Sequence, residues 1–355
     1  MRRSVMRWPL LAAVLGSSTL AACWGGAGAG SPVRVTIPAG VPFRAAADSL
    51  ASRQLITMPR VFSTYAKLRG RDRNVKAGTY LLRRGASWNW ILDAIANGRG
   101  MVRGMTIPEG WSLTQIVPQL ARVLELPPES VDVAVRDTAL LHHLDIPTPT
   151  LEGYLFPETY LFPVGTSARG AVRLMVNEFE KRWKPEWDDQ LRALAMSRND
   201  ILALAAIIEK EAKVPEERPV ISAVYHNRLK RGMLLQADPT VQYALGRHVT
   251  RVLFKDLTVD SRYNTYRYKG LPPGPIASPG TPSIEAALHP ADVPYLYFVA
   301  APDGHHEFRR TFAEHAKAIA EIKAAARAAR LRAVAESTAK SLRPGLAPTG
   351  PRTRR

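Results

Sequence analysis

One five-residue pattern occurs twice and limits the local structure of the first third of the chain. Residues 36–40 read TIPAG, and residues 106–110, 70 positions later, read TIPEG. Each copy ends a run with β-branched residues, which favours a strand, and its proline and glycine favour a turn. An amphipathic helical pattern follows each copy. Each copy therefore predicts a strand, a tight turn and a helix, which together make a small α/β unit.

Residues 33–100 form the first predicted module. A second apolar run at residues 78–82 indicates another strand, and Ser87 stands where an N-cap residue begins a further helix. The resulting strand–helix–helix–strand module resembles a LysM-type carbohydrate-binding domain. The alternative is a structural spacer domain.

The net charge of +18 is concentrated towards the two ends of the 355-residue chain. Residues 1–22 carry three arginines and no acid, and residues 323–355 carry nine basic residues against one glutamate. The body between them keeps +7 once these contributions of +3 and +8 are set aside. The charge therefore does not indicate a nucleic-acid-binding protein. The basic, alanine-rich tail, residues 321–355, is typical of a solvated segment or of one that contacts a membrane surface.

The N-terminus has the layout of an export signal. Three arginines precede a mainly apolar stretch at residues 8–20, and small residues then lead to Cys23, the only cysteine. The LAAC sequence that ends at Cys23 resembles the lipoprotein signal, in which this cysteine is lipidated. An uncleaved membrane helix is the alternative, although a span needs ~20 apolar residues. Residues 24–32 are interpreted as a glycine-rich tether, and we expect the remainder outside the cytoplasmic membrane.

A helix at residues 201–212 carries the acidic residues best suited to catalysis. The preceding residues 197–200 (SRND) resemble a capping box, with aspartate in place of the usual Glu or Gln. Glu209 and Glu211 lie late in this apolar helix, about 200° apart, so they cannot form a dyad with each other. Burial raises a carboxyl pKa, which a general acid requires. Both glutamates have apolar neighbours, and the periodicity does not choose between them.

A structural role is the alternative for this acidic helix end. One of the two glutamates then pairs with a nearby cation, which is Lys210, Lys213 or Arg218.

Polar residues further along the chain are candidates for contact with a ligand. Gln236 and Asp238 alternate with apolar residues, as on a short strand. Asp238 also precedes a proline, and we expect it to cap the next helix more readily than to bind a ligand. Residues 270–280 are rich in proline and glycine, which excludes a helix or a central strand and predicts an ordered loop. Residues 294–300 favour a strand.

Two other features of the chain bear on its function. The loop at residues 151–160 (LEGYLFPETY) carries aromatic side chains that either stack on sugar rings or pack in a core. The histidines His289, His305 and His306 are scattered, and neither a metal-ligand spacing nor a glycine-rich phosphate loop is present in the sequence. We therefore expect no metal and no cofactor.

Four stretches together are similar to the endolytic murein transglycosylase family, also called YceG-like. They lie in order over about residues 33–320 and read TIPEGWSLTQI, LEGYLFPETY, IIEKEAKVPEERPVISAVYHNRLKRGMLLQADPTVQYALG and YNTYRYKGLPPGPIASPGTPSIEAALHPADVPYLYFVA. The resemblance implies an α+β fold, with a small LysM-like domain at residues 33–100 and an α+β catalytic domain at residues 101–320. It maps the catalytic glutamate onto Glu209, with Glu211 as the fallback. Family members usually carry a transmembrane helix, whereas this apolar segment ends in LAAC.

The family reaction cuts peptidoglycan strands internally and without water. The resemblance implies cleavage between N-acetylmuramic acid and N-acetylglucosamine, with 1,6-anhydro ends that terminate nascent strands, and it implies no cofactor. The implied partners are glycan strands, the cytoplasmic membrane and the peptidoglycan synthases. A non-catalytic peptidoglycan-binding protein and an exported hydrolase that uses water are the alternatives. We expect the cleft to be lined by Gln236, Asp238, Tyr243, Asn264 and Tyr266.

Overall fold

The computed structural model describes residues 26–246, 249 and 252–341. The chain divides into two compact units. Unit 1 comprises residues 1–106, 117–131 and 159–171, and unit 2 comprises residues 107–116, 132–158 and 172–355. In this division the chain returns to each unit after leaving it.

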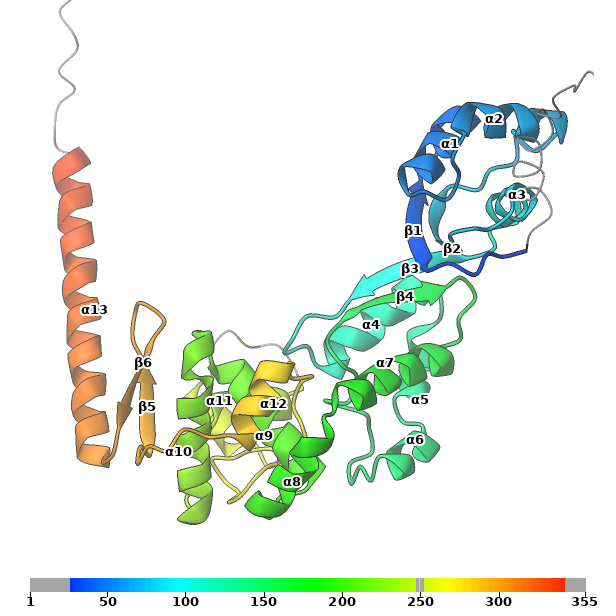
Figure 1. The fold of residues 1–355 in the computed structure, drawn as a ribbon. Coiled ribbons are helices and arrows are strands. Elements are labelled where there is room, and N and C mark those ends of the chain that lie inside the picture. The colour runs from blue at the N-terminus through cyan, green and yellow to red at the C-terminus, as the bar shows by residue number, and fades with distance from the viewer. Residues whose placement is uncertain (1–25, 247–248, 250–251, 342–355) are drawn as a thin grey trace, which may run out of the picture. The chain divides into compact units, whose positions relative to one another are not determined.

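Unit 1 is built on a four-stranded antiparallel sheet with the order β1-β2-β3-β4 (Figure 1). Val35 in β1 lies opposite Tyr80 in β2, and both side chains are buried. Buried residues of three helices join them in one core. The strands are β1 (Pro32–Ile37), β2 (Gly78–Arg83), β3 (Met101–Thr106) and β4 (Thr159–Pro163), and the helices are α1 (Phe43–Ser52), α2 (Pro59–Leu68) and α3 (Trp88–Asn97).

The local predictions for unit 1 are confirmed. A strand and a helix flank the first TIP-x-G copy, and a second strand follows at the expected place. The Ser87 hydroxyl accepts a hydrogen bond from the Trp90 N–H at 3.2 Å, so Ser87 is the N-cap of α3. Gly98 ends this helix in the left-handed conformation, as C-terminal glycines commonly do.

Three helices contain residues of both units. They are α4 (Leu113–Leu124), α5 (Pro128–Ala134) and α7 (Ala168–Arg182). Helix α7 is followed directly by a separate helix, α8 (Pro185–Leu194). The break has a simple cause, because Pro185 occupies the first turn of α8 and proline lacks the N–H that a continuous helix would need.

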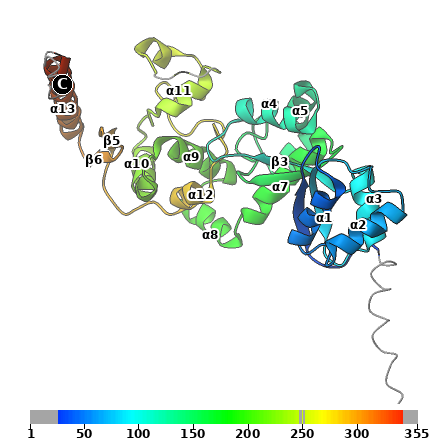
Figure 2. The ribbon, with the colours of Figure 1, turned by 90° about the horizontal axis from the view of Figure 1, so that it is seen from above.

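Unit 2 is mainly helical around α9 (Arg198–Glu211). Every residue of α9 from Ile201 to Ile208 is buried, and the helix packs against α10, α11 and α12. Figure 2 shows α9 alongside α10 and α12. The remaining helices are α6 (Thr138–His143), α10 (Arg218–Lys230), α11 (Asp238–Ala244), α12 (Thr281–Leu288) and the 3₁₀ helices η2 (Pro215–Glu217) and η3 (Phe254–Thr258).

The end of the described chain is a hairpin followed by a long helix. Strands β5 (Tyr297–Ala300) and β6 (His306–Arg309) pair antiparallel, and α13 (Phe312–Ser341) packs against both of them (Figure 1). The strand expected at residues 294–300 is confirmed. Helices and antiparallel sheets together confirm the α+β class.

The predicted membrane anchor is outside the part of the chain that the structure describes. This holds for residues 1–23, including the proposed lipidation site Cys23, and for residues 342–355 of the basic tail. Within the described residues, no helix combines the length and the apolar character that a membrane crossing requires.

One local prediction in unit 2 is wrong. Residues 236–238 form no strand, because Gln236 has a φ of +52° and Asp238 is already the first residue of α11. Ala237 occupies the N-cap position, and no side-chain hydrogen bond caps α11. The sequence predicted Asp238 as the N-cap residue, whereas it is the first residue inside the helix. Its carboxylate is used in a different contact, described below.

Candidate active site

Helix α9 delivers both candidate glutamates from a fixed, buried scaffold. The expected capping box is present: the Asp200 N–H donates to the Ser197 hydroxyl at 3.1 Å, and the Ser197 N–H donates to the Asp200 carboxylate at 2.9 Å. The cap fixes the start of the helix, and the packing of its apolar residues on all sides fixes its direction. Glu209 and Glu211 lie in the last turn, where the helix leaves the core.

Glu209 is held by one backbone group and one cation. Its Oε2 accepts a hydrogen bond from the Gly280 N–H at 3.0 Å, and its Oε1 lies 3.6 Å from Nη2 of Arg218. The side chains of Glu209 and Arg218 are 8% and 14% exposed. Of the three cations considered from the sequence, Arg218 is therefore the one that pairs with Glu209. The pairing orients the carboxylate and leaves part of it accessible.

Two loops meet at Glu209 through backbone hydrogen bonds. The Gly110 N–H donates to the Ser278 carbonyl at 2.8 Å, and the Ser278 N–H donates to the Trp111 carbonyl at 2.8 Å. Lys210 links the loop that contains Gly110 to α9, because its Nζ donates to the Gly110 carbonyl at 3.2 Å. The second TIP-x-G copy and the proline-rich loop thus form one wall of the site.

Glu109 brings a second carboxylate to this wall, and the sequence reasoning missed it. A Cβ atom built on Gly280 would overlap the Glu109 carboxyl group, so this group lies directly against the glycine that binds Glu209. Partial burial raises the pKa of Glu109, the Glu209 charge raises it further, and the Arg218 charge opposes both. The signal available in the sequence was the repeat itself, where Glu109 replaces Ala39.

Glu211 has a separate set of partners, as the angle between the two glutamates predicted. The Tyr225 hydroxyl donates to Glu211 Oε1 at 3.3 Å. Burial raises the pKa of Glu211 to about 7, and the Asp238 charge adds to the effect, while Arg228 and Lys213 oppose it. Glu211 is thus a carboxyl group that is partly protonated near neutral pH.

Three of the expected cleft residues lie around Glu211. The Tyr266 hydroxyl donates to Asp238 Oδ1 at 2.6 Å, and burial followed by this hydrogen bond raises the pKa of Tyr266. The Gln236 side-chain oxygen accepts a hydrogen bond from Arg228 Nη1 at 3.4 Å. The charge of Arg228 in turn acts on Glu211. Gln236, Asp238 and Tyr266 are therefore parts of one polar network with Glu211.

Tyr243 belongs to a third cluster, centred on Glu152. Glu152 is 3% exposed, and both of its carboxylate oxygens accept a hydrogen bond from the Leu113 N–H at 3.1 Å, at the start of α4. Burial raises the pKa of Glu152 to about 7, partly offset by the Leu113 N–H and by Tyr243. The Tyr243 ring lies 4.8 Å from the Tyr263 ring. The sequence reasoning missed Glu152, although it lies in the aromatic stretch singled out above.

The aromatic side chains of that stretch pack in the core. Tyr154, Phe156 and Tyr160 are each at most 6% exposed. Tyr154 also makes an edge contact with Phe179 at 5.2 Å between ring centroids. The aromatic side chains of residues 151–160 therefore pack in the core, which was one of the two interpretations of this stretch, the other being stacking on sugar rings.

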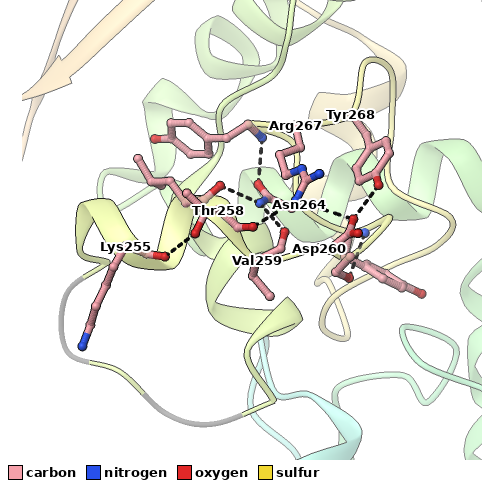
Figure 3. Close-up of polar contacts among 11 residues, drawn as sticks. Lys255, Thr258, Val259, Asp260, Asn264, Arg267 and Tyr268 are labelled. Atoms are coloured by element: carbon pink, nitrogen blue, oxygen red, sulfur yellow. Dashed lines mark hydrogen bonds and ion pairs between the residues drawn. The ribbon is translucent and has the colours of Figure 1, made fainter.

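Asn264 organises the loop that carries Tyr266 (Figure 3). Its Nδ2 donates to the carbonyl oxygens of Leu257 and Val259 at 2.9 and 2.8 Å, and its Oδ1 accepts the Tyr266 N–H at 3.0 Å. The residue is fully buried. These bonds assign the amide of Asn264 to loop geometry, and its contact with a substrate stays a prediction.

The histidines are less scattered than the sequence suggested. His305 and His306 both contact Glu217, and Nδ1 of His306 lies 2.6 Å from Glu217 Oε2. Burial acts to raise the pKa of Glu217, but the His306 N–H, which donates to Glu217 Oε1 at 2.9 Å, and the two rings lower it below its usual value. Among the described residues, no group of three His, Cys, Asp or Glu side chains is arranged to hold a metal ion.

Comparison with known proteins places this chain in a family. The sequence pattern of the YceG-like family matches residues 35–321, so the chain belongs to the YceG-like family. A Bacillus subtilis (strain 168) protein named endolytic murein transglycosylase is 37% identical over 305 residues, which cover 81% of this chain and 83% of that protein. A protein of the same name from Streptococcus pneumoniae serotype 2 (strain D39 / NCTC 7466) is 28% identical over 81% of this chain and 58% of its own length.

A solved structure supports the same assignment. The crystal structure of a YceG-like protein from Listeria monocytogenes matches 81% of this chain and 98% of its own chain, with 35% sequence identity and a TM-score of 0.59. The resemblance inferred from the four sequence stretches is thereby confirmed at the level of the family.

Proposed function

We propose that this chain is a peptidoglycan lyase of the lytic transglycosylase type, with Glu209 as its catalytic acid and base. The observation that carries the proposal is the Glu209 carboxylate, which is largely buried at the end of α9 and oriented by the Gly280 N–H and Arg218. The names of the curated relatives support the substrate class. The proposed bond cleaved is the one between N-acetylmuramic acid and N-acetylglucosamine, inside a glycan strand.

The proposed reaction needs one carboxyl group for two proton transfers. Glu209 first donates its proton to the glycosidic oxygen as the bond to the muramic acid ring breaks. The Glu209 carboxylate then accepts the proton of the C6 hydroxyl of the same sugar, whose oxygen closes the 1,6-anhydro ring. General acid–base catalysis of this kind contributes ~10²–10⁴-fold. A glycosidase that uses water relies on two carboxylates instead.

The Glu211 network is the proposed second part of the substrate site. Glu211, Gln236, Asp238 and Tyr266 supply hydrogen-bonding groups on one side of α9. Tyr243 and Asn264 stay proposed as further substrate contacts. Replacement of Asn264 by Ala with unchanged turnover would remove it from this group.

The wider cellular role extends the same proposal. We propose that residues 33–100 form a LysM-like module that binds glycan and that residues 101–320 form the catalytic domain. Lipidation of Cys23 would hold the protein at the cytoplasmic membrane, with the catalytic domain on the outer side. There it would cut nascent strands and so terminate their elongation, beside the peptidoglycan synthases.

Product mass tests the activity. Peptidoglycan strands are digested with the full-length protein in detergent and, in parallel, with Glu209→Gln, and the products are analysed by mass spectrometry. Internal cuts with ends one water lighter than hydrolysis products, absent in the variant, support the lyase and its acid/base. Products at the full hydrolytic mass would mean a glycosidase that uses water. Binding of strands without cleavage by either protein would favour the non-catalytic binding protein.

A further inference from the structure

A pocket of about 460 Å³ lies in unit 2 beside the proposed reaction centre. Its walls come from the start of α8, from η2 with the start of α10, and from one side of α12. The volume falls within the range of about 300–1,000 Å³ that is usual for small-ligand sites. Of the residues that line it, the function proposed above uses only Arg218.

Helix α12 connects this pocket to Glu209. The N–H of Gly280, the N-cap residue of α12, donates to Glu209 at 3.0 Å. Glu285 and Ala286 follow on the side of the helix that lines the pocket. At 1.5 Å of rise per residue, Ala286 lies about 9 Å along the helix from Gly280. A ligand in the pocket is therefore close to a strand whose scissile bond lies at Glu209.

Arg218 lies between the two places. Its Nη2 is 3.6 Å from Glu209 Oε1, its Nε donates to the Ser283 hydroxyl of α12 at 3.1 Å, and its side chain also lines the pocket. The guanidinium thus forms a shared boundary of the reaction centre and the pocket.

The lining of the pocket combines both signs of charge with apolar surface. Lys184 pairs with Glu285 at 2.6 Å, and their side chains are 45% and 42% exposed. Such an exposed ion pair contributes little to stability, so each partner is available to a ligand group of opposite charge. Glu186 adds a second acid. The apolar lining residues are Trp187, Pro215, Pro219, Pro282 and Ala286.

These residues fit a short peptide better than a sugar or a phosphate. Trp187 is 2% exposed, and Lys184 Nζ lies over its ring at 5.3 Å from the centre, so this ring is not free to stack on a sugar. The acids Glu186 and Glu285 would repel a phosphate. A peptide that carries both a carboxylate and an amino group finds a partner for each, and its aliphatic side chains match the apolar lining.

The proposed substrate carries such a peptide close to the reacting bond. In peptidoglycan, short peptides are attached to N-acetylmuramic acid, the sugar whose bond Glu209 is proposed to break. An extended peptide spans ~3.3–3.6 Å per residue, so about three residues cover the ~9 Å between Gly280 and Ala286. The length of the peptide is therefore sufficient to reach the pocket.

We propose that this pocket binds the peptide attached to the muramic acid at the cleavage site, so that the protein prefers strands that carry peptides. The proposal rests on the proposed function, because it takes the position of the substrate from Glu209. Lys184 and Glu285 bind charged groups of the peptide, and the apolar lining contacts its aliphatic side chains.

The test compares two substrates for the full-length protein in detergent. One is peptidoglycan strands with their peptides, and the other is the same strands after an amidase has removed the peptides. We expect kcat/KM to be about tenfold higher for strands with peptides, the effect of a hydrogen bond to a charged group. The difference should lie mainly in KM, because the pocket binds a part of the substrate that does not react.

Lys184→Met tests the pocket itself. Lys184 is the N-cap residue of α8 but makes no side-chain cap bond, so its replacement leaves the start of the helix intact. The ratio of kcat/KM for the two substrates should fall from about ten to about three or less. Lys181→Met is the matched control, because Lys181 is also exposed and pairs with Glu178 at 3.5 Å, but does not line the pocket. It should keep the wild-type ratio.

The outcomes that would overturn the peptide site are distinct from failure of the proposed function. Equal kcat/KM for the two substrates in the wild type, or an unchanged ratio in Lys184→Met, refutes the peptide site, while cleavage itself still supports the function. Absence of cleavage of both substrates by the wild type refutes the function, and the peptide site with it.

Discussion

The two TIP-x-G copies have the same local structure and different surroundings. In each copy a strand ends at or just before a buried isoleucine: Ile37 and Ile107 are both 2% exposed. In each copy the glycine has a left-handed backbone, with φ of +74° at Gly40 and +76° at Gly110. A helix follows within a few residues in both. The strand, turn and helix are thus set by the local pattern alone.

The surroundings of the two glycines differ. A Cβ atom on Gly40 would have no other described atom within 4 Å, whereas one on Gly110 would lie 3.6 Å from both Glu209 Cγ and Lys210 Cδ. The following helices also begin differently. Helix α1 has no side-chain cap, whereas the first N–H of α4 is bound by the distant Glu152. The same local unit is part of the candidate active site in the second copy and not in the first.

Loss of the Glu209 carboxyl group, which lies next to the second copy, is expected to have the largest effect. Glu209→Gln keeps the shape of the side chain but cannot donate and accept the proton in turn, so turnover should fall by ~10²–10⁴-fold. Asp48→Asn, which removes an exposed carboxylate from the helix after the first copy, should leave turnover unchanged. Rates of release of anhydro-ended products provide the measurement. A loss below tenfold in Glu209→Gln would shift the catalytic assignment to Glu211.

Glu152, which accepts a hydrogen bond from the first N–H of α4, should make the stability of the fold depend on pH. Burial raises the pKa of Glu152 to about 7 from 4.5 in the unfolded chain. The folded state therefore binds the proton more tightly, and stability is lost as pH rises from about 4.5 to about 7. The expected contribution of this one group is about 3 kcal/mol. Glu211, with a pKa also raised to about 7, adds a slope of the same sign.

Urea unfolding at pH 5 and pH 8 measures this dependence. Glu152→Gln should show a smaller difference between the two pH values than the wild type, because the contribution of Glu152 is gone. Glu129→Gln, which changes an exposed carboxylate on α5, should retain the full difference. An undiminished difference in Glu152→Gln would mean that Glu152 does not titrate in this range.

Crowding of the Glu109 carboxylate should have an intermediate effect. Gly280→Ala is free of backbone strain, but its Cβ would overlap the Glu109 carboxyl group, which must move. We expect about a tenfold loss of kcat/KM at neutral pH, because a small displacement of groups at a reaction centre slows the chemical step, and little change in melting temperature. Gly26→Ala, with no other described atom within 4 Å of its Cβ, serves as the control. Full activity of Gly280→Ala would contradict the close packing of Glu109.

The smallest effect is expected where the two copies are alike. Gly40→Ala and Gly110→Ala each force an alanine into a left-handed conformation, at a cost of about 1 kcal/mol. The costs should be similar, because the added Cβ has open space in one copy and ordinary contact distances in the other. Chemical denaturation of both variants gives the comparison. A much larger loss in Gly110→Ala would show that the Glu209 side of the loop cannot adjust.

Much of the local structure could be predicted from the sequence. The capping box at Ser197 and Asp200, the N-cap Ser87 and the strands of unit 1 all followed from patterns within a few residues. The opposite directions of Glu209 and Glu211 followed from helix geometry. The exceptions were also local. The positive φ of Gln236 has no marker in the sequence, and Asp238 is the first residue of α11 and not its N-cap.

The sequence by itself determined the family, the elements and the helix that carries the two glutamates, because these depend on short-range periodicity and on residue types in long matching stretches. Only the tertiary structure decided which partners each carboxylate has. Gly280 and Glu109 lie 71 and 100 residues from Glu209 in the sequence, and Glu152 lies 39 residues from Leu113. Contacts over such separations depend on how helices and loops pack, and no local pattern encodes them.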